Sequence, residues 1–242
     1  MEKLYKQSLI IKIIAVVTMI IDHVGALFFP QILLLRIIGR LSFPLFGLLV
    51  AEGFDKTHNK KKYLFRMFCF FLVSQIPYYL TFHDGQLNIF VTLSIGLSTI
   101  WILTEKKLEL FFKVLFTACL LFIAFILPIN YGLAGVISII SFYFLKNSPW
   151  KLSIAQIVIW SVYIGFSILN GMFDNELINY KNEITQLVAV LAIPIIYLIK
   201  KYSITTEYFL ISRTKKYLVQ YGFYLFYPVH LLLLFVLTLL IQ

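Results

Sequence analysis

Long apolar runs dominate the sequence and constrain its fold more than any other feature. The runs are continuous rather than alternating, and a segment in hydrocarbon must satisfy its own backbone hydrogen bonds, so each run predicts a helix and not a barrel strand. Only 13% of the residues are charged and 61% are hydrophobic, which is unlike a soluble domain. We therefore expect an all-α, polytopic transmembrane helical bundle of about nine spans. The runs lie at about residues 7–29, 33–53, 63–81, 88–104, 108–127, 131–146, 152–170, 185–200 and 217–240.

No repeat, low-complexity tract or soluble segment separates these runs, so residues 1–242 are expected to form a single integral-membrane domain. The chain opens like a signal sequence, with three lysines before an apolar core, but it lacks a small-residue cleavage site. It is expected to stay as the first helix. The two cysteines, Cys69 and Cys119, lie inside apolar runs, and we expect neither a disulfide nor a metal site.

The basic residues predict an orientation because they gather in alternate connections between the runs. Of the 21 lysines and arginines, 18 lie at the N-terminus or in and beside the second, fourth, sixth and eighth connections. The intervening connections hold one, Lys181. The positive-inside tendency then predicts a cytoplasmic N-terminus and, with nine spans, a C-terminus outside. The net charge of +10 is explained by this topology and by contact with lipid headgroups, and nucleic acid is not an expected partner.

Four ionisable residues in the first two runs are not explained by topology. Arg36 and Arg40 lie i, i+4 on one helix face, and an arginine at membrane depth costs about 2.5–3.5 kcal/mol on insertion scales. The short connection makes the two helices antiparallel neighbours, so Asp22 is expected to pair with one of these arginines. His23 follows Asp22 directly, but adjacent helical side chains point apart, so no Asp–His dyad is expected. A purely structural ion pair is the alternative reading.

The last run carries a polar stripe on an otherwise apolar helix. Gln220, Tyr224, Tyr227 and His230 follow one another at spacings of four, three and three residues, which places them on one face. A buried histidine satisfied by its surroundings is the plain alternative to a functional one. If the stripe is functional, the site is assembled from the first, second and last helices.

A third group of candidates lies where the second run ends and the third begins. In the simpler interpretation, these residues form a solvent-exposed loop whose positive charge only sets the membrane orientation. In the functional interpretation, they bind a phosphorylated cofactor from the cytoplasm. Glu52 ends an apolar helix, and Arg66 is its expected partner. Gln75, Asn88 and Asn130 are lesser polar features. The members of the third group are Glu52, Lys60, Lys61, Lys62, Tyr63 and Arg66.

Taken in order, these motifs resemble the TraX family, which is known for N-acetylating the pilin subunit of conjugative pili. The family is similar in turn to the acyltransferase type 3 class, membrane enzymes that modify sugars and peptides. The blocks GRLSFPLF and FYLFYPVHL carry most of the resemblance, which extends over nearly the whole chain. Its other parts are DH in the first run, EGF with the basic segment after it, and SQIP at the end of the third run.

The resemblance implies a multi-pass acetyltransferase of the bacterial plasma membrane. It would move an acetyl group from cytoplasmic acetyl-CoA to an amine or hydroxyl of a membrane-associated or extracytoplasmic acceptor, such as a pilin-like peptide, another peptide or an envelope glycan. Acyl-CoA, membrane lipids and this acceptor are the expected partners. The family's signature residues would map onto Asp22, His23, Arg36, Arg40, Glu52, Arg66, Tyr227 and His230.

His23 is the candidate general base, because imidazole titrates near neutrality. Arg36 or Arg40 would stabilise the oxyanion or hold a phosphate, and the Lys60–Arg66 segment would hold the coenzyme's phosphates. Two rival interpretations remain. The chain is a small transporter or proton-coupled channel that uses the same intramembrane charges as a relay, although no internal duplication is visible. Otherwise it is a non-catalytic membrane scaffold.

Overall fold

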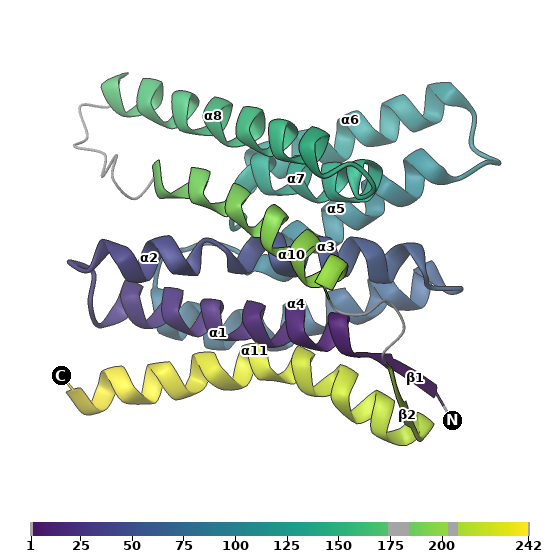
Figure 1. Cartoon of the computed structure of the whole chain (residues 1–242). Helices are drawn as coiled ribbons and strands as arrows, with labels where there is room; N and C mark the ends of the chain where they lie inside the picture. The colour runs from purple at the N-terminus through teal and green to yellow at the C-terminus, as the bar shows by residue number, and fades with distance from the viewer. Residues whose placement is uncertain (1, 174–183, 203–207, 242) are drawn as a thin grey trace. The chain divides into compact units, whose positions relative to one another are not determined.

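The computed structural model describes residues 2–173, 184–202 and 208–241, and nearly all of these are helical (Figure 1). The expected all-helical architecture is confirmed, apart from a short ladder of two strands that the sequence did not indicate. In chain order the elements are β1 (Glu2–Tyr5), α1 (Lys6–Leu27), α2 (Leu33–Gly39), α3 (Ser42–Asp55), α4 (Lys60–Phe82), α5 (Ile89–Thr104), α6 (Leu110–Ile126), α7 (Gly132–Leu145), α8 (Pro149–Phe173), η1 (Thr185–Leu191), α10 (Ala192–Tyr202), β2 (Tyr208–Ile211) and α11 (Arg213–Ile241).

Five helical stretches in the described part of the chain are long and apolar enough to cross a membrane. They are Lys6–Leu27, Leu33–Asp55, Lys60–Phe82, Pro149–Leu169 and Tyr221–Ile241. Helices α5, α6 and α7 are apolar but shorter. Each apolar run of the sequence coincides with one of these helices or with η1 and α10, which supports a multi-pass membrane protein. The orientation remains a prediction.

The chain divides into two compact units. The first contains Met1–Leu49 and Asn147–Phe223, and the second contains Val50–Lys146 and Tyr224–Gln242, so the division falls within α3 and within α11. The expectation of one domain over residues 1–242 is left untested by this division.

Two prolines explain why two of the expected spans are not uniform α-helices. Pro44 has no N–H to donate to the carbonyl of Arg40, and its ring crowds that carbonyl. The expected helix at 33–53 therefore breaks after Gly39 and resumes as α3 at Ser42, where a proline in the first turn is tolerated. Pro194 has the same effect on the expected span at 185–200. It lies in the first turn of α10, which starts at Ala192, and the turns before it form the 3₁₀-helix η1.

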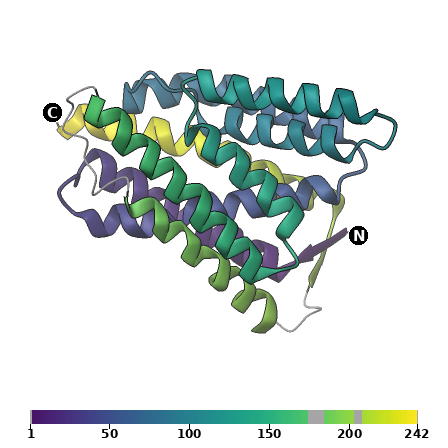
Figure 2. The same cartoon turned by 90° about the horizontal axis from the view of Figure 1, so that it is seen from above.

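The first unit is organised around the pair formed by α1 and α2, which lie side by side (Figure 1). In Figure 2, α8 runs beside α10. Trp160 of α8 packs edge-on against Phe43 of α3, with ring centres 6.0 Å apart. Strands β1 and β2 pair antiparallel, with Glu2 opposite Ile211 and Tyr5 opposite Tyr208. The buried residues of α1 recur every three or four positions and so form one stripe, which runs from Ile11 to Gly25 and includes Asp22.

In the second unit α5 lies among α4, α6 and α7, and Figure 2 shows the teal helices α5–α7 packed together. A Cβ at Gly96 would lie 2.9 Å from the side chain of Ile139, so this glycine lets α5 and α7 approach closely. Leu87 and Ile129 form an isolated parallel bridge between the segments that precede α5 and α7. The starts of these two helices are thereby joined through the backbone.

Candidate functional site

The cluster around Asp22 depends on how closely α1 and α2 pack. A Cβ at Gly39 would overlap both the Cβ and Oδ1 of Asp22. At Gly25 it would lie 2.7 Å from the Cβ of Leu35. Because glycine occupies both positions, the helices meet without side chains between them, and the buried Asp22 reaches the arginines of the neighbouring helix.

The expected pairing of Asp22 with the arginines is present in the first unit. Arg36 Nη1 lies 3.0 Å from Asp22 Oδ1, and the same nitrogen donates to the backbone carbonyl of Asp22 at 2.9 Å. Arg40 Nη1 is 4.0 Å from Asp22 Oδ2. One carboxylate therefore faces two guanidinium groups, and these three side chains together carry one net positive charge. The side chains of Arg36 and Arg40 are 18% and 9% exposed, so this charge is held largely away from water.

A third element, η1, contributes to this cluster. Arg40 Nε donates to Thr185 Oγ1 at 3.2 Å, and both residues are buried. Gln186 is buried next to Thr185. Sequence analysis missed both residues. The signal that was available is the polar pair Thr-Gln, which opens the otherwise apolar run at 185–200.

His23 is half-buried on α1 and lies off the buried stripe that holds Asp22. The two neighbouring side chains therefore point in different directions, as helix geometry predicts. The carboxylate of Asp22 faces the guanidinium groups of Arg36 and Arg40, so its observed contacts are with these arginines and not with the imidazole of His23. The role of His23 as a base stays a prediction.

Tyr227 and His230, from the polar stripe of α11, are buried in the second unit. Tyr227 lies edge-on to Phe90 of α5 at 5.4 Å and to His230 at 5.5 Å between ring centres, and its hydroxyl accepts from the backbone N–H of Ile89. His230 Nδ1 lies 3.0 Å from the carbonyl of Phe226, which favours the neutral tautomer with its proton on Nδ1. Within this unit Tyr227 lies at the N-terminus of α5. Asp22 and His23 belong to the other unit.

Residues that sequence analysis ranked as lesser form a dense polar network in the second unit. Asn88 is fully buried; it caps α5 by accepting from Phe90 N at 3.0 Å, and its amide donates to Phe71 O and Gln75 Oε1. Asn130 Nδ2 donates to the hydroxyl of Tyr78 at 3.0 Å. The network joins α4, the start of α5 and the segment before α7, and pattern alone could not reveal it because its members are far apart in sequence.

The basic segment at the start of α4 is also in the second unit. Lys60 Nζ donates to Thr104 Oγ1 at 3.2 Å, whereas Lys61 and Lys62 are exposed. Tyr63 is buried, and its hydroxyl is 3.4 Å from the carbonyl of Val50. No acidic side chain stands in this first turn, where the helix dipole would favour one.

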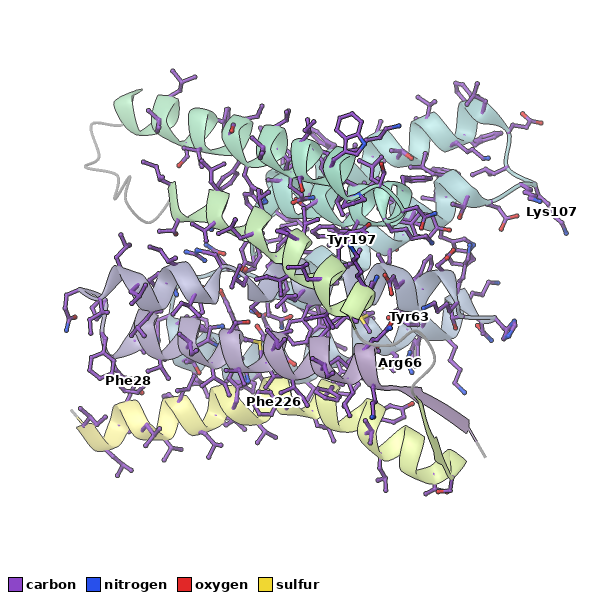
Figure 3. The ribbon with its side chains drawn as sticks, in the orientation of Figure 1. Phe28, Tyr63, Arg66, Lys107, Tyr197 and Phe226 are labelled. Carbon is purple, nitrogen blue, oxygen red and sulfur yellow. The ribbon has the colours of Figure 1, made fainter. Side chains whose placement is uncertain are left out.

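Glu52 and Arg66 were expected to pair with each other. Glu52 Oε2 lies 3.8 Å from Lys56 Nζ, one turn further along α3. Arg66 lies over two aromatic rings, at 4.9 Å from the ring centre of Tyr63 and 5.1 Å from that of Tyr224. Tyr63 and Arg66 are labelled in Figure 3. The direct pairing of Glu52 with Arg66 stays a prediction.

Comparison with known proteins identifies the family. The family model described as TraX protein matches residues 7–238, which is nearly the whole chain. This protein belongs to the TraX family. It is also similar to a probable fimbrial assembly protein, FimC of serogroup H1, from Dichelobacter nodosus, at 37% identity over 73 residues. That match covers 28% of this chain and 30% of the relative's length, and no solved structure matches the chain.

Proposed function

We propose that this TraX-family protein is a membrane-embedded acetyltransferase that uses acetyl-CoA and acts at the bacterial plasma membrane with its N-terminus in the cytoplasm. The observation that carries the proposal is the buried cluster of one carboxylate and two arginines, with His23 next to Asp22 in the sequence, in a chain that matches the family over residues 7–238. Buried ionisable groups in a membrane helix are expensive and are typical of functional sites. A scaffold would need only one balanced ion pair.

In the proposed reaction His23 accepts the proton of the attacking amine or hydroxyl. The new bond forms between that nitrogen or oxygen and the acetyl carbonyl carbon, while the thioester C–S bond breaks and the coenzyme leaves as the thiol, which takes up the proton that His23 accepted. Arg36 and Arg40 stabilise the negative charge that develops on the carbonyl oxygen, and Asp22 keeps both guanidinium groups in place. Tyr227 and His230 are assigned to acceptor binding or to a second proton transfer.

The Lys60–Arg66 segment is assigned to the phosphates of acetyl-CoA. Glu52, at the end of α3, borders this segment. The exposed Lys61 and Lys62 supply long-range attraction, and Arg66 offers the planar donor set that suits phosphate oxygens. The pilin acetylation that the sequence resemblance implies, and the description of the relative as a fimbrial assembly protein, both favour a peptide amine as the acceptor, ahead of an envelope glycan.

The first test is coenzyme binding by the full chain in lipid nanodiscs. We expect CoA and acetyl-CoA to raise the thermal unfolding midpoint by several degrees, because a ligand that binds only the folded state stabilises it. A second measurement follows label from radioactive acetyl-CoA into the envelope proteins of membranes that contain the protein. A transporter or scaffold would show neither effect, and their absence would remove the proposal.

A further inference from the structure

The guanidinium of Arg66 is held by aromatic rings, and this distinguishes it from the arginines of the first unit. Its carbon lies 4.9 Å from the ring centre of Tyr63 and 5.1 Å from that of Tyr224. Figure 3 labels Tyr63 and Arg66, which lie one turn apart near the start of α4. Arg36 and Arg40, by contrast, face the carboxylate of Asp22.

Both rings that hold Arg66 are themselves fixed. Tyr224 stacks on Phe70 with ring centres 4.9 Å apart and planes 17° apart, and the Tyr63 hydroxyl lies 3.4 Å from the carbonyl of Val50. A Cβ at Gly53 would lie 3.0 Å from the Tyr63 hydroxyl, so glycine leaves this hydroxyl just enough room. The arrangement joins α3, α4 and α11 around one charged group.

This way of holding an arginine has a chemical consequence. Cation–π stacking acts on the faces of the guanidinium plane, whereas its five N–H donors point outward along the edge. Contact with the ring faces therefore restrains the guanidinium without itself occupying the N–H edge, which is the part that binds a phosphate in bidentate fashion. A lysine at this position would keep the charge but would lose the stacked plane.

We propose that Tyr224 is a positioning residue for Arg66, and that the Tyr63–Arg66–Tyr224 stack recognises the phosphate-bearing end of the CoA thioester. The inference rests on the proposed function, since it assigns a ligand group to the donor site. It makes Arg66 the specificity-determining contact of the basic segment and leaves the exposed lysines in a supporting role. Tyr224 acts through Arg66 and does not touch the reacting atoms.

The test is a double-mutant cycle read out as the Kd of CoA, measured by calorimetry on the full chain in nanodiscs. Tyr224→Leu is expected to weaken binding about tenfold, and Arg66→Lys to weaken it to a similar degree. The double variant is expected to bind no more weakly than Arg66→Lys alone, because Tyr224 has no effect without the guanidinium. Tyr224→Phe keeps the stacked ring and is expected to stay within about twofold of wild type.

Tyr79→Leu is the matched control, because Tyr79 is an exposed tyrosine of α4 outside the stack. Wild-type affinity in Tyr224→Leu, or losses that add in the double variant, would overturn the inference. If Tyr224→Leu does not fold, the Kd values of Tyr224→Phe and Arg66→Lys for CoA test the inference instead. Wild-type affinity of Arg66→Lys for CoA would then contradict the inference. If the folded wild type does not bind CoA at all, the proposed donor is wrong and this inference falls with it.

Discussion

The carboxylate of Asp22 lies 3.0 Å from Arg36 Nη1, at the point where Gly39 lets α2 come closest to α1. The ion pair and the close packing therefore depend on each other. A side chain at Gly39 would push the helices apart, and loss of the carboxylate would leave two arginines facing each other. The first two predictions separate these effects.

Gly39→Ala is expected to destabilise the protein by about 1–3 kcal/mol, because the added Cβ would overlap Asp22 and force a backbone shift. The measurement is the free energy of unfolding in mixed micelles titrated with a denaturing detergent. Gly165→Ala is the control, since a Cβ on that helical glycine would meet nothing within 4 Å. It is expected to be neutral or slightly stabilising, and equal losses in the two variants would contradict the close-packing account.

Asp22→Asn is expected to cost about 3–5 kcal/mol, because it leaves buried guanidinium groups without their counter-charge. Combined with Arg36→Gln in a cycle, the coupling energy is expected to be about 0.5–3 kcal/mol. Asp55→Asn removes a half-exposed carboxylate that pairs with Lys146, and its expected cost is at most about 1 kcal/mol. Additive effects of the Asp22 and Arg36 changes would show that the pair is not energetically coupled.

Thr185→Val is expected to lower the rate of acetyl transfer about tenfold to a hundredfold, because the hydrogen bond that holds Arg40 Nε is lost and such bonds to charged groups contribute about 1.5–3 kcal/mol. Thr185→Ser keeps the hydroxyl and is expected to retain most of the activity. The measurement is the kcat for labelled acetyl-CoA in membranes. Equal activity of the valine and serine variants would remove Thr185 from the site.

Asn88→Ala is expected to destabilise the protein by about 3 kcal/mol or more. It removes a helix cap and also leaves the part-buried Phe71 carbonyl without this donor, while Gln75 Oε1 keeps only the backbone N–H of residue 88. Asn59→Ala removes only an exposed cap of α4, which accepts from Lys62 N, and is expected to cost about 1 kcal/mol. A similar small loss in both variants would mean that the network around Asn88 contributes little.

Sequence reasoning located the helices because hydropathy is a local property, and it located the pairing of Asp22 with the arginines because the connection between α1 and α2 is short. It did not locate Thr185, which lies 145 positions from Arg40. Contacts of that kind depend on the rotation and depth of packed helices, which close approaches such as the one at Gly39 determine. The break before Ser42 was missed for a different reason, since Pro44 interrupts a helix without interrupting the apolar run.

The most direct test of the account is acetyl transfer by the His23→Ala variant. Membranes that contain wild type, His23→Ala or the exposed loop control His58→Ala are incubated with radioactive acetyl-CoA, and label in envelope proteins is counted. Loss of the general base is expected to reduce transfer by about 10²–10⁴-fold, while His58→Ala matches wild type. Wild-type transfer by folded His23→Ala would contradict the assignment of His23 as the base.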